Sequence, residues 1–161
     1  MIRPATPDDE RALRALDLAN WSSLSSPGPA PPPERPFEIE GVLVAELEDG
    51  IAGYVKLGPV FPLEASRHVL EIKGLTVSSA HRRRGVGRAL MAAAIRTATE
   101  AGARRLTLRV LGHNEDARSL YAACGFEVEG VLREFFYLDG RYVDDVLMTL
   151  PLTAGGSPAS T

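Results

Sequence analysis

Cysteine is almost absent from this chain of 161 residues, and long apolar runs are absent altogether. The single cysteine, Cys124, cannot form an internal disulfide, and His68, His81 and His113 are too scattered to form a metal site with it. No apolar run approaches the roughly 18 residues of a membrane-spanning helix, and residues 1–10 lack the apolar stretch of a secretory signal. We therefore expect a cytoplasmic protein without a metal and without a membrane partner.

The composition is otherwise ordinary for a globular protein, with 45% hydrophobic and 24% charged residues. A chain of this length normally forms one domain with a sizeable core. We expect a single domain over residues 1–152, with a proline-rich surface loop at 21–36 inside it. Residues 153–161, which are rich in Gly, Ser and Ala, are expected to be a disordered tail.

The formal net charge of −3 conceals an uneven distribution. Residues 81–109 hold eight arginines and one acid, Glu100, so the remainder of the chain is strongly acidic. A local positive field in an acidic protein suits a small polyanion better than a long nucleic acid, which the acidic surface would repel. We therefore expect no nucleic-acid partner.

Apolar periodicity and turn residues predict a mixed α/β fold in the order β-α-β-β-β-α-β-α-β-β. Such an order favours a central mixed, mostly antiparallel sheet with helices on both faces. The Asp49-Gly50 and Asp139-Gly140 pairs predict hairpin turns. The strands expected after the first helix span 42–48, 51–60, 69–77, 106–110, 128–137 and 141–150, and the expected helices span 7–19, 85–101 and 115–124.

The strand at 69–77 has an irregular alternation of apolar residues. Leu70 and Ile72 share one face, whereas Leu75 and Val77 are out of phase with them. A β-bulge near Lys73 and Gly74 would return all four side chains to one face, and it would also separate this strand from its neighbour.

Residues 76–88 read TVSSAHRRRGVGR, a strand that runs through a basic glycine loop into a helix. The free N–H groups of a first helical turn bind phosphate oxygens, so a pyrophosphate is the expected ligand. A Walker loop is excluded because Gly87 is followed by Arg88 rather than by lysine. A dinucleotide-binding fingerprint fits poorly because Leu90 occupies the third glycine position, and Arg109 lies where an acid is expected.

The loop resembles the coenzyme A pyrophosphate loop of the GNAT superfamily of N-acetyltransferases, through Arg82-x-x-Gly85-x-Gly87. Residues 114–126, NEDARSLYAACGF, are similar to the second signature of that family. The resemblance covers about residues 42–150 and implies a sheet splayed between its fourth and fifth strands, 69–77 and 106–110. The pantetheine arm of acetyl-CoA would lie in that opening. The implied cofactor-binding residues are Leu75, Thr76, Val77, Arg82, Arg83, Arg84, Gly85, Val86, Gly87, Arg88, Asn114 and Ala117.

The resemblance also implies catalytic roles for two residues. Tyr121 would donate a proton to the departing thiolate; the alternative is a core tyrosine beside Leu120 and Phe126. Glu71 would accept the proton of the amine; the alternatives are a solvent-facing carboxylate and a chain of water molecules.

Two nearby residues have simpler interpretations. Asn114 would either bond to pantetheine or cap the following helix. Cys124 lies at a helix C-terminus, where the helix dipole disfavours a thiolate, so we expect a buried thiol and direct transfer of the acetyl group.

These features predict an N-acetyltransferase that moves an acetyl group from acetyl-CoA to a primary amine in a ternary complex. A non-catalytic CoA-binding regulatory module of the same fold is the alternative. The identity of the acceptor amine and the existence of a homodimer remain open at this stage.

Overall fold

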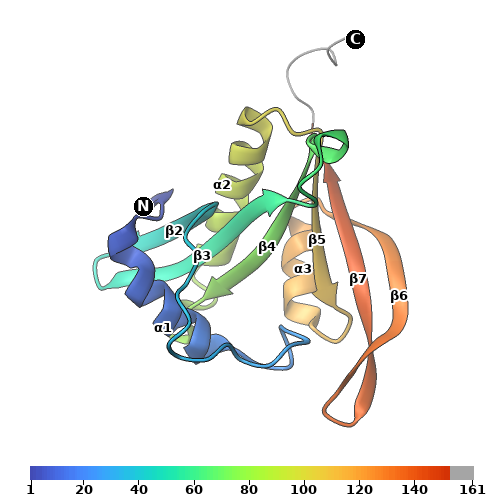
Figure 1. Ribbon diagram of the computed structural model, residues 1–161, viewed down its shortest axis with the longest axis horizontal. Helices are drawn as coiled ribbons and strands as arrows, with labels where there is room; N and C mark the ends of the chain where they lie inside the picture. Colours follow the sequence, from blue (N-terminus) through green and yellow to red (C-terminus); the bar gives the residue numbers. More distant parts are fainter. Residues whose placement is uncertain (153–161) are drawn as a thin grey trace.

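The computed structural model describes residues 1–152 and has one seven-stranded sheet in the order β1-β2-β3-β4-β5-β7-β6 (Figure 1). The expected tail at 153–161 lies outside the described residues. The strands are β1 (Ile2–Pro4), β2 (Val42–Leu47), β3 (Gly50–Pro59), β4 (Val69–Val77), β5 (Arg105–Leu111), β6 (Glu127–Leu138) and β7 (Arg141–Pro151). The helices are α1 (Glu10–Asn20), α2 (Val86–Glu100) and α3 (Glu115–Ala123).

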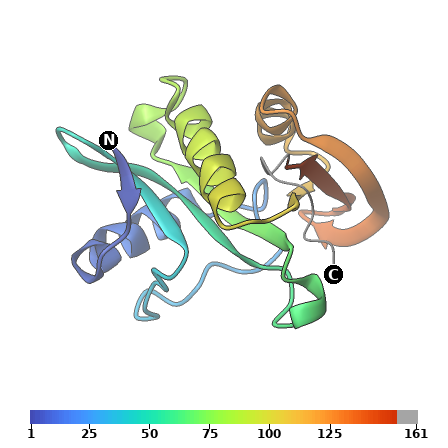
Figure 2. The ribbon, with the colours of Figure 1, turned by 90° about the horizontal axis from the view of Figure 1, so that it is seen from above.

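The sheet is mixed and mostly antiparallel, as the sequence predicts. Five of its neighbouring strand pairs are antiparallel, and β4 with β5 is the parallel pair. Helices α2 and α3 cover one face, and α1 lies on the opposite face (Figure 2). The mixed α/β class with helices on both faces is therefore confirmed.

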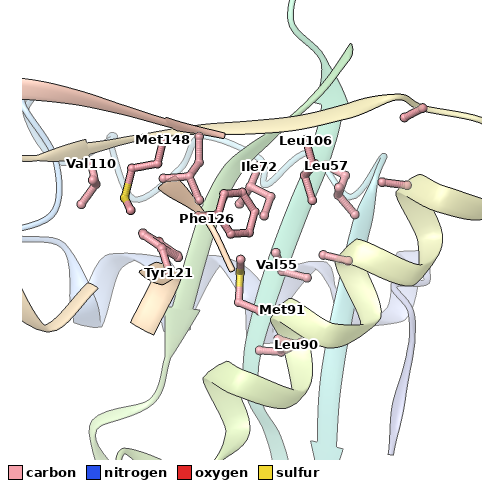
Figure 3. Close-up of a cluster of buried hydrophobic side chains, with 14 of the residues drawn as sticks. Val55, Leu57, Ile72, Leu90, Met91, Leu106, Val110, Tyr121, Phe126 and Met148 are labelled. Atoms are coloured by element: carbon pink, nitrogen blue, oxygen red, sulfur yellow. The ribbon is translucent and has the colours of Figure 1, made fainter. Parts of the chain in front are cut away.

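The main core lies between the sheet and helices α2 and α3. Leu90 and Met91 of α2 pack against Val55 and Ile72 from the sheet, all with at most 5% of their surface exposed (Figure 3). A smaller cluster, which includes Leu13 of α1 and Tyr54 of β3, fills the other face. Burial of such side chains stabilises the fold by about 1.5–3 kcal/mol each.

The start of α1 is fixed to the edge of the sheet by a network around Asp9. Its carboxylate accepts hydrogen bonds from the Arg3 guanidinium at 2.8 and 3.0 Å and from the Thr6 backbone N–H at 2.7 Å. The bond from Arg3 holds the pKa of Asp9 well below its usual range. This network therefore fixes the position of α1, and the other end of that helix reaches the candidate site.

The predicted bulge in β4 is confirmed. Lys56 of β3 is opposite Gly74, and Leu57 is opposite Ile72, so Lys73 has no partner in β3. The extra residue restores the alternation, and Leu75 and Val77 pack on the main core together with Ile72.

The parallel pairing of β4 with β5 stops where the bulge begins. It joins 69–72 to 105–108, and it does not continue beyond Ile72 and Leu108. From there the two strands diverge (Figure 1). The predicted splay between the fourth and fifth strands is therefore confirmed.

The two predicted hairpins also form, with one difference in register. Leu138 is opposite Arg141, so Asp139 and Gly140 make the last turn as expected, both with positive φ. In the first hairpin Gly50 is already paired with Leu47, so the turn consists of residues 48–49 rather than of Asp49 and Gly50.

Candidate active site

The loop between β4 and α2 presents unused backbone donors. Arg83 and Gly85 have φ values of 61° and 80°, in the left-handed region, and Gly85 is the N-cap of α2. No side chain caps this helix, and the N–H of Ala89 makes the first backbone bond, to Gly85 at 3.0 Å. The N–H groups of residues 86–88 therefore have no partner within the helix and can bind an anion.

A cavity of ≈ 470 Å³, here called the loop cavity, lies beside these donors. Gly87 lines this cavity, and a Cβ at this position would lie 3.3 Å from Leu120 Cδ2 and 3.6 Å from Val77 Cγ2, which belong to two other lining residues. The arginines supply positive charge at its rim. The lining residues are Val77, His81, Arg82, Arg83, Gly85, Val86, Gly87, Arg88, Asp116, Ala117 and Leu120.

A second cavity of ≈ 260 Å³, here called the strand cavity, occupies the opening between β4 and β5. It shares Ala117 with the loop cavity, so the two meet at the first turn of α3. Its lining residues are Asp17, Asn20, Trp21, Ser25, Ser26, Tyr54, Ile72, Lys73, Gly74, Leu75, Thr76, Leu108, Arg109, Val110, Asn114, Ala117 and Tyr121.

Tyr121 fits both alternatives that the sequence allows, because it packs in the core and also faces a cavity. It is buried at 8% exposure, packs against Phe126 with a ring-centroid distance of 6.2 Å (Figure 3), and lines the strand cavity. Burial raises its pKa to about 12. The phenol therefore stays protonated at neutral pH and has a proton that it can donate.

Asn114 caps α3 and also borders the strand cavity. Its Oδ1 accepts a hydrogen bond from the N–H of Ala117 at 3.3 Å. Burial raises the pKa of the Cys124 thiol, so this residue is a poor nucleophile, as expected.

Two of the predicted site residues lie outside both cavities. Arg84 is exposed on the loop and does not line the loop cavity. Glu71 is half-buried on β4, opposite Gly58 of β3 and Thr107 of β5, one residue before the cavity-lining Ile72. The other predicted residues line one cavity or both.

Sequence reasoning missed the residues that close the strand cavity from the side of α1. The Tyr54 hydroxyl donates a hydrogen bond to Asp17 Oδ1 at 2.6 Å, and burial together with this bond raises the pKa of Tyr54. Trp21 and Lys73 complete this wall. The helical pattern of α1 marks Asp17 only as a polar position, and the contact to Tyr54 spans 37 residues of sequence.

The start of the proline-rich loop crosses the open end of the strand cavity. Arg82 donates to Asn20 at 3.1 Å, a ring nitrogen of His113 lies 3.1 Å from the carbonyl oxygen of Ser23, and the Ser23 hydroxyl bonds to Asp139. The first contact joins the end of α1 to the loop before α2, and the other two join the proline-rich loop to the loop before α3 and to the last hairpin. Ser25 and Ser26 consequently line the cavity.

Comparison with known proteins identifies the family. The model of the acetyltransferase (GNAT) family matches residues 11–126. The chain belongs to the GNAT family of acetyltransferases. This result confirms the resemblance found in the two sequence motifs.

Individual relatives agree with this assignment. The chain is 36% identical to phosphinothricin N-acetyltransferase of Alcaligenes faecalis over 115 residues, which are 70% of this chain and 57% of that protein. The chain thus spans little more than half of that relative. The solved structure of a ribosomal-protein-alanine N-acetyltransferase from Brucella melitensis is 30% identical, with a TM-score of 0.79, and covers 94% of this chain and 99% of its own.

A third likeness concerns the fold alone. A GNAT phosphinothricin acetyltransferase from Sinorhizobium meliloti, solved in complex with acetyl-CoA, is 22% identical with a TM-score of 0.85 and covers 100% of this chain and 92% of its own.

Within residues 1–152, no helix is long and apolar enough to cross a membrane. The same residues contain no group of three His, Cys, Asp or Glu side chains that could hold a metal ion.

Deletion of Lys73 should abolish the opening while the protein still folds. Without the extra residue, Ile72, Leu75 and Val77 keep a regular alternation, and β4 can continue its pairing with β5. We expect the affinity for CoA, measured by calorimetry, to fall about tenfold or more. Lys73→Gln keeps the bulge and should bind CoA normally. Unchanged affinity in the folded deletion variant would show that the bulge does not create the site.

Gly87→Val should weaken CoA binding more than it weakens folding. The valine side chain would enter the loop cavity between Leu120 and Val77 and prevent close approach of phosphate to the N–H groups of residues 86–88. We expect a loss of affinity of about tenfold or more with a near-normal melting temperature. Ala89→Val, at an exposed position of α2, is the matched control. Equal CoA affinity in both variants would argue against this loop as the pyrophosphate site.

Proposed function

We propose that this protein transfers the acetyl group of acetyl-CoA to a primary amine by direct attack of the amine within a ternary complex. The observation that carries the proposal is the meeting of the loop cavity and the strand cavity at Ala117. One extended ligand can thereby reach from the anion-binding N–H groups of α2 to the phenol of Tyr121. Relatives that are named N-acetyltransferase or N-acyltransferase favour an enzyme over the non-catalytic alternative.

The chain offers separate binding groups for the two ends of the cofactor. The N–H groups of residues 86–88 and the arginines of the loop would bind the pyrophosphate. The pantetheine would bond to the edge of β4 at 75–77, because these residues pair with β3 on one side and have lost β5 on the other. An unpaired strand edge offers N–H and C=O groups to an extended ligand. When bound, acetyl-CoA supplies an activated thioester.

The chain would then move two protons. In the overall reaction an ammonium group loses two protons, its nitrogen forms a bond to the acetyl carbon, and the carbon–sulfur bond breaks. One proton goes to the base, and the other replaces the proton that a general acid gives to the departing thiolate. Tyr121 is placed to give that proton, because it lines the strand cavity and its raised pKa keeps it protonated.

We propose Glu71 as the group that receives the proton of the amine. Glu71 adjoins Ile72 on β4 but does not itself line the strand cavity, so the proton would reach it through one water molecule. The support for this role is its position on the splayed strand.

We also propose that the protein forms a homodimer and is located in the cytoplasm. Strand β6 forms one edge of the sheet and exposes Val128, Val131 and Phe135, each with more than 40% of its surface accessible. An apolar sheet edge of this kind suits pairing with a second copy of the chain. A cytoplasmic location is consistent with the single, unpaired cysteine.

Tyr121→Phe should lower kcat by about 10²- to 10⁴-fold and leave the affinity for acetyl-CoA nearly unchanged, because the ring still packs against Phe126. In the wild type, kcat should not fall between about pH 8 and 10, since the phenol with a pKa near 12 keeps its proton there. Tyr137→Phe, on the exposed part of β6, is the control. A normal kcat under conditions in which chemistry is rate-limiting would limit Tyr121 to a packing role.

Glu71→Gln should remove the acidic limb of the pH profile of kcat/KM and lower activity by about 10²-fold or more near neutral pH. Activity should partly recover at alkaline pH, where more of the amine is already neutral. The control is Glu48→Gln, an exposed carboxylate in the first hairpin turn. If Glu71→Gln keeps wild-type activity and the same acidic limb, another group is the base. Inactivity at every pH with intact CoA affinity would instead indicate a role in positioning the acceptor.

A further inference from the structure

A third cavity, here called the basic cavity, adjoins the strand cavity on the side of α1 and has a volume of ≈ 240 Å³. The proline-rich loop forms one of its walls, and the two cavities share Asp17, Trp21, Tyr54, Lys73 and Gly74. A small molecule in the basic cavity can therefore extend into the opening that holds Tyr121. The lining residues are Arg14, Asp17, Leu18, Trp21, Pro31, Pro32, Arg35, Pro36, Phe37, Glu38, Tyr54, Lys56, Lys73 and Gly74.

The charges of the basic cavity are not balanced. Of its four cationic side chains, Lys56 pairs with Glu38 at 3.5 Å and Arg14 with Glu10 at 3.7 Å. Arg35 and Lys73 form no ion pair with any residue in 1–152. Both side chains are exposed at the mouth of the cavity, and prolines and aromatic rings make up much of the remaining wall. Two uncompensated cations in such surroundings favour a bound anionic group.

A carboxylate lies where the basic cavity meets the strand cavity. Asp17 Oδ1 accepts the Tyr54 hydroxyl at 2.6 Å, and Oδ2 accepts no hydrogen bond from the described residues. Asp17 is also the acidic residue that lines both cavities. Its free oxygen is a suitable partner for the ammonium group of an amine that approaches Tyr121.

We propose that the acceptor is a small α-amino acid, whose ammonium group binds Asp17 and whose carboxylate binds Lys73 and Arg35. Lys73 lines both cavities, as Asp17 does, so a cationic and an anionic site lie together at the junction. In an α-amino acid the ammonium nitrogen and the carboxylate carbon are bonded to the same carbon atom, so the two charges lie close together, as these two sites do. The apolar wall with Trp21 and Phe37 would receive the side chain. This inference rests on the proposed acetyl-transfer function and specifies its substrate class.

The test compares each amino acid with the amine that lacks only its carboxylate. The pairs are L-methionine with 3-(methylthio)propylamine, L-phenylalanine with 2-phenylethylamine, and L-leucine with 3-methylbutylamine. Release of the CoA thiol gives kcat/KM for each acceptor. We expect at least one amino acid to exceed its paired amine about tenfold or more, because a charge-assisted hydrogen bond discriminates by about that factor.

Variants then assign the preference to the cavity. Lys73→Gln and Arg35→Gln should each lower the ratio of kcat/KM for the preferred amino acid to kcat/KM for its paired amine by about tenfold or more. Asp17→Asn should lower kcat/KM for both members of the pair, since both carry the ammonium group. Arg11→Gln, an exposed cation of α1 outside the cavities, is the control and should behave as the wild type. Melting temperatures establish that each variant is folded.

The outcomes separate this inference from the proposed function. Equal or better transfer to the paired amines, preference for a peptide N-terminus over free amino acids, or a preference that persists in both Lys73→Gln and Arg35→Gln would overturn the amino-acid acceptor and leave acetyl transfer intact. Absence of acetyl-CoA binding and of transfer to every amine would overturn the proposed function and this inference with it.

Discussion

The extra residue in β4 is the constraint on which the rest of this structure depends. Lys73 has no partner in β3, and the parallel pairing with β5 ends one residue before it. A regular strand would have continued that pairing and closed the sheet. The bulge keeps Ile72, Leu75 and Val77 on the core face, so the opening costs no apolar burial there. The bulge at Lys73 thus accounts both for the packing of β4 on the core and for the opening between β4 and β5.

The opening connects features on the two faces of the sheet. The loop cavity lies beside α2 and α3, whereas the basic cavity lies beside α1 and the proline-rich loop. The strand cavity shares residues with both, namely Ala117 with the first and Asp17 with the second. A cofactor and an acceptor can therefore approach from opposite faces and meet at Tyr121. The proline-rich loop, fixed through Ser23 and through the adjoining Asn20 of α1, encloses the meeting point.

The sequence predicts those parts of the site that depend on local pattern. The phase change between Ile72 and Leu75 reveals the bulge, and the glycine spacing before α2 reveals the anion-binding turn. It does not predict Asp17 and Tyr54, because their contact depends on how α1 lies across the sheet. Nor does it predict that Arg84 lies outside the loop cavity, since adjacent side chains of a loop point in different directions. Long-range packing decides the first, and the local conformation of the loop decides the second.

The most direct test of this account is a crystal structure of the chain grown with CoA. We expect the pyrophosphate at the N–H groups of residues 86–88 and the pantetheine in the opening, bonded to the edge of β4 at 75–77, with its sulfur facing Tyr121. The strands β4 and β5 should remain apart beyond Ile72. CoA bound elsewhere, or β4 paired with β5 along its full length in the complex, would contradict the central claim that the bulge at Lys73 creates the cofactor site.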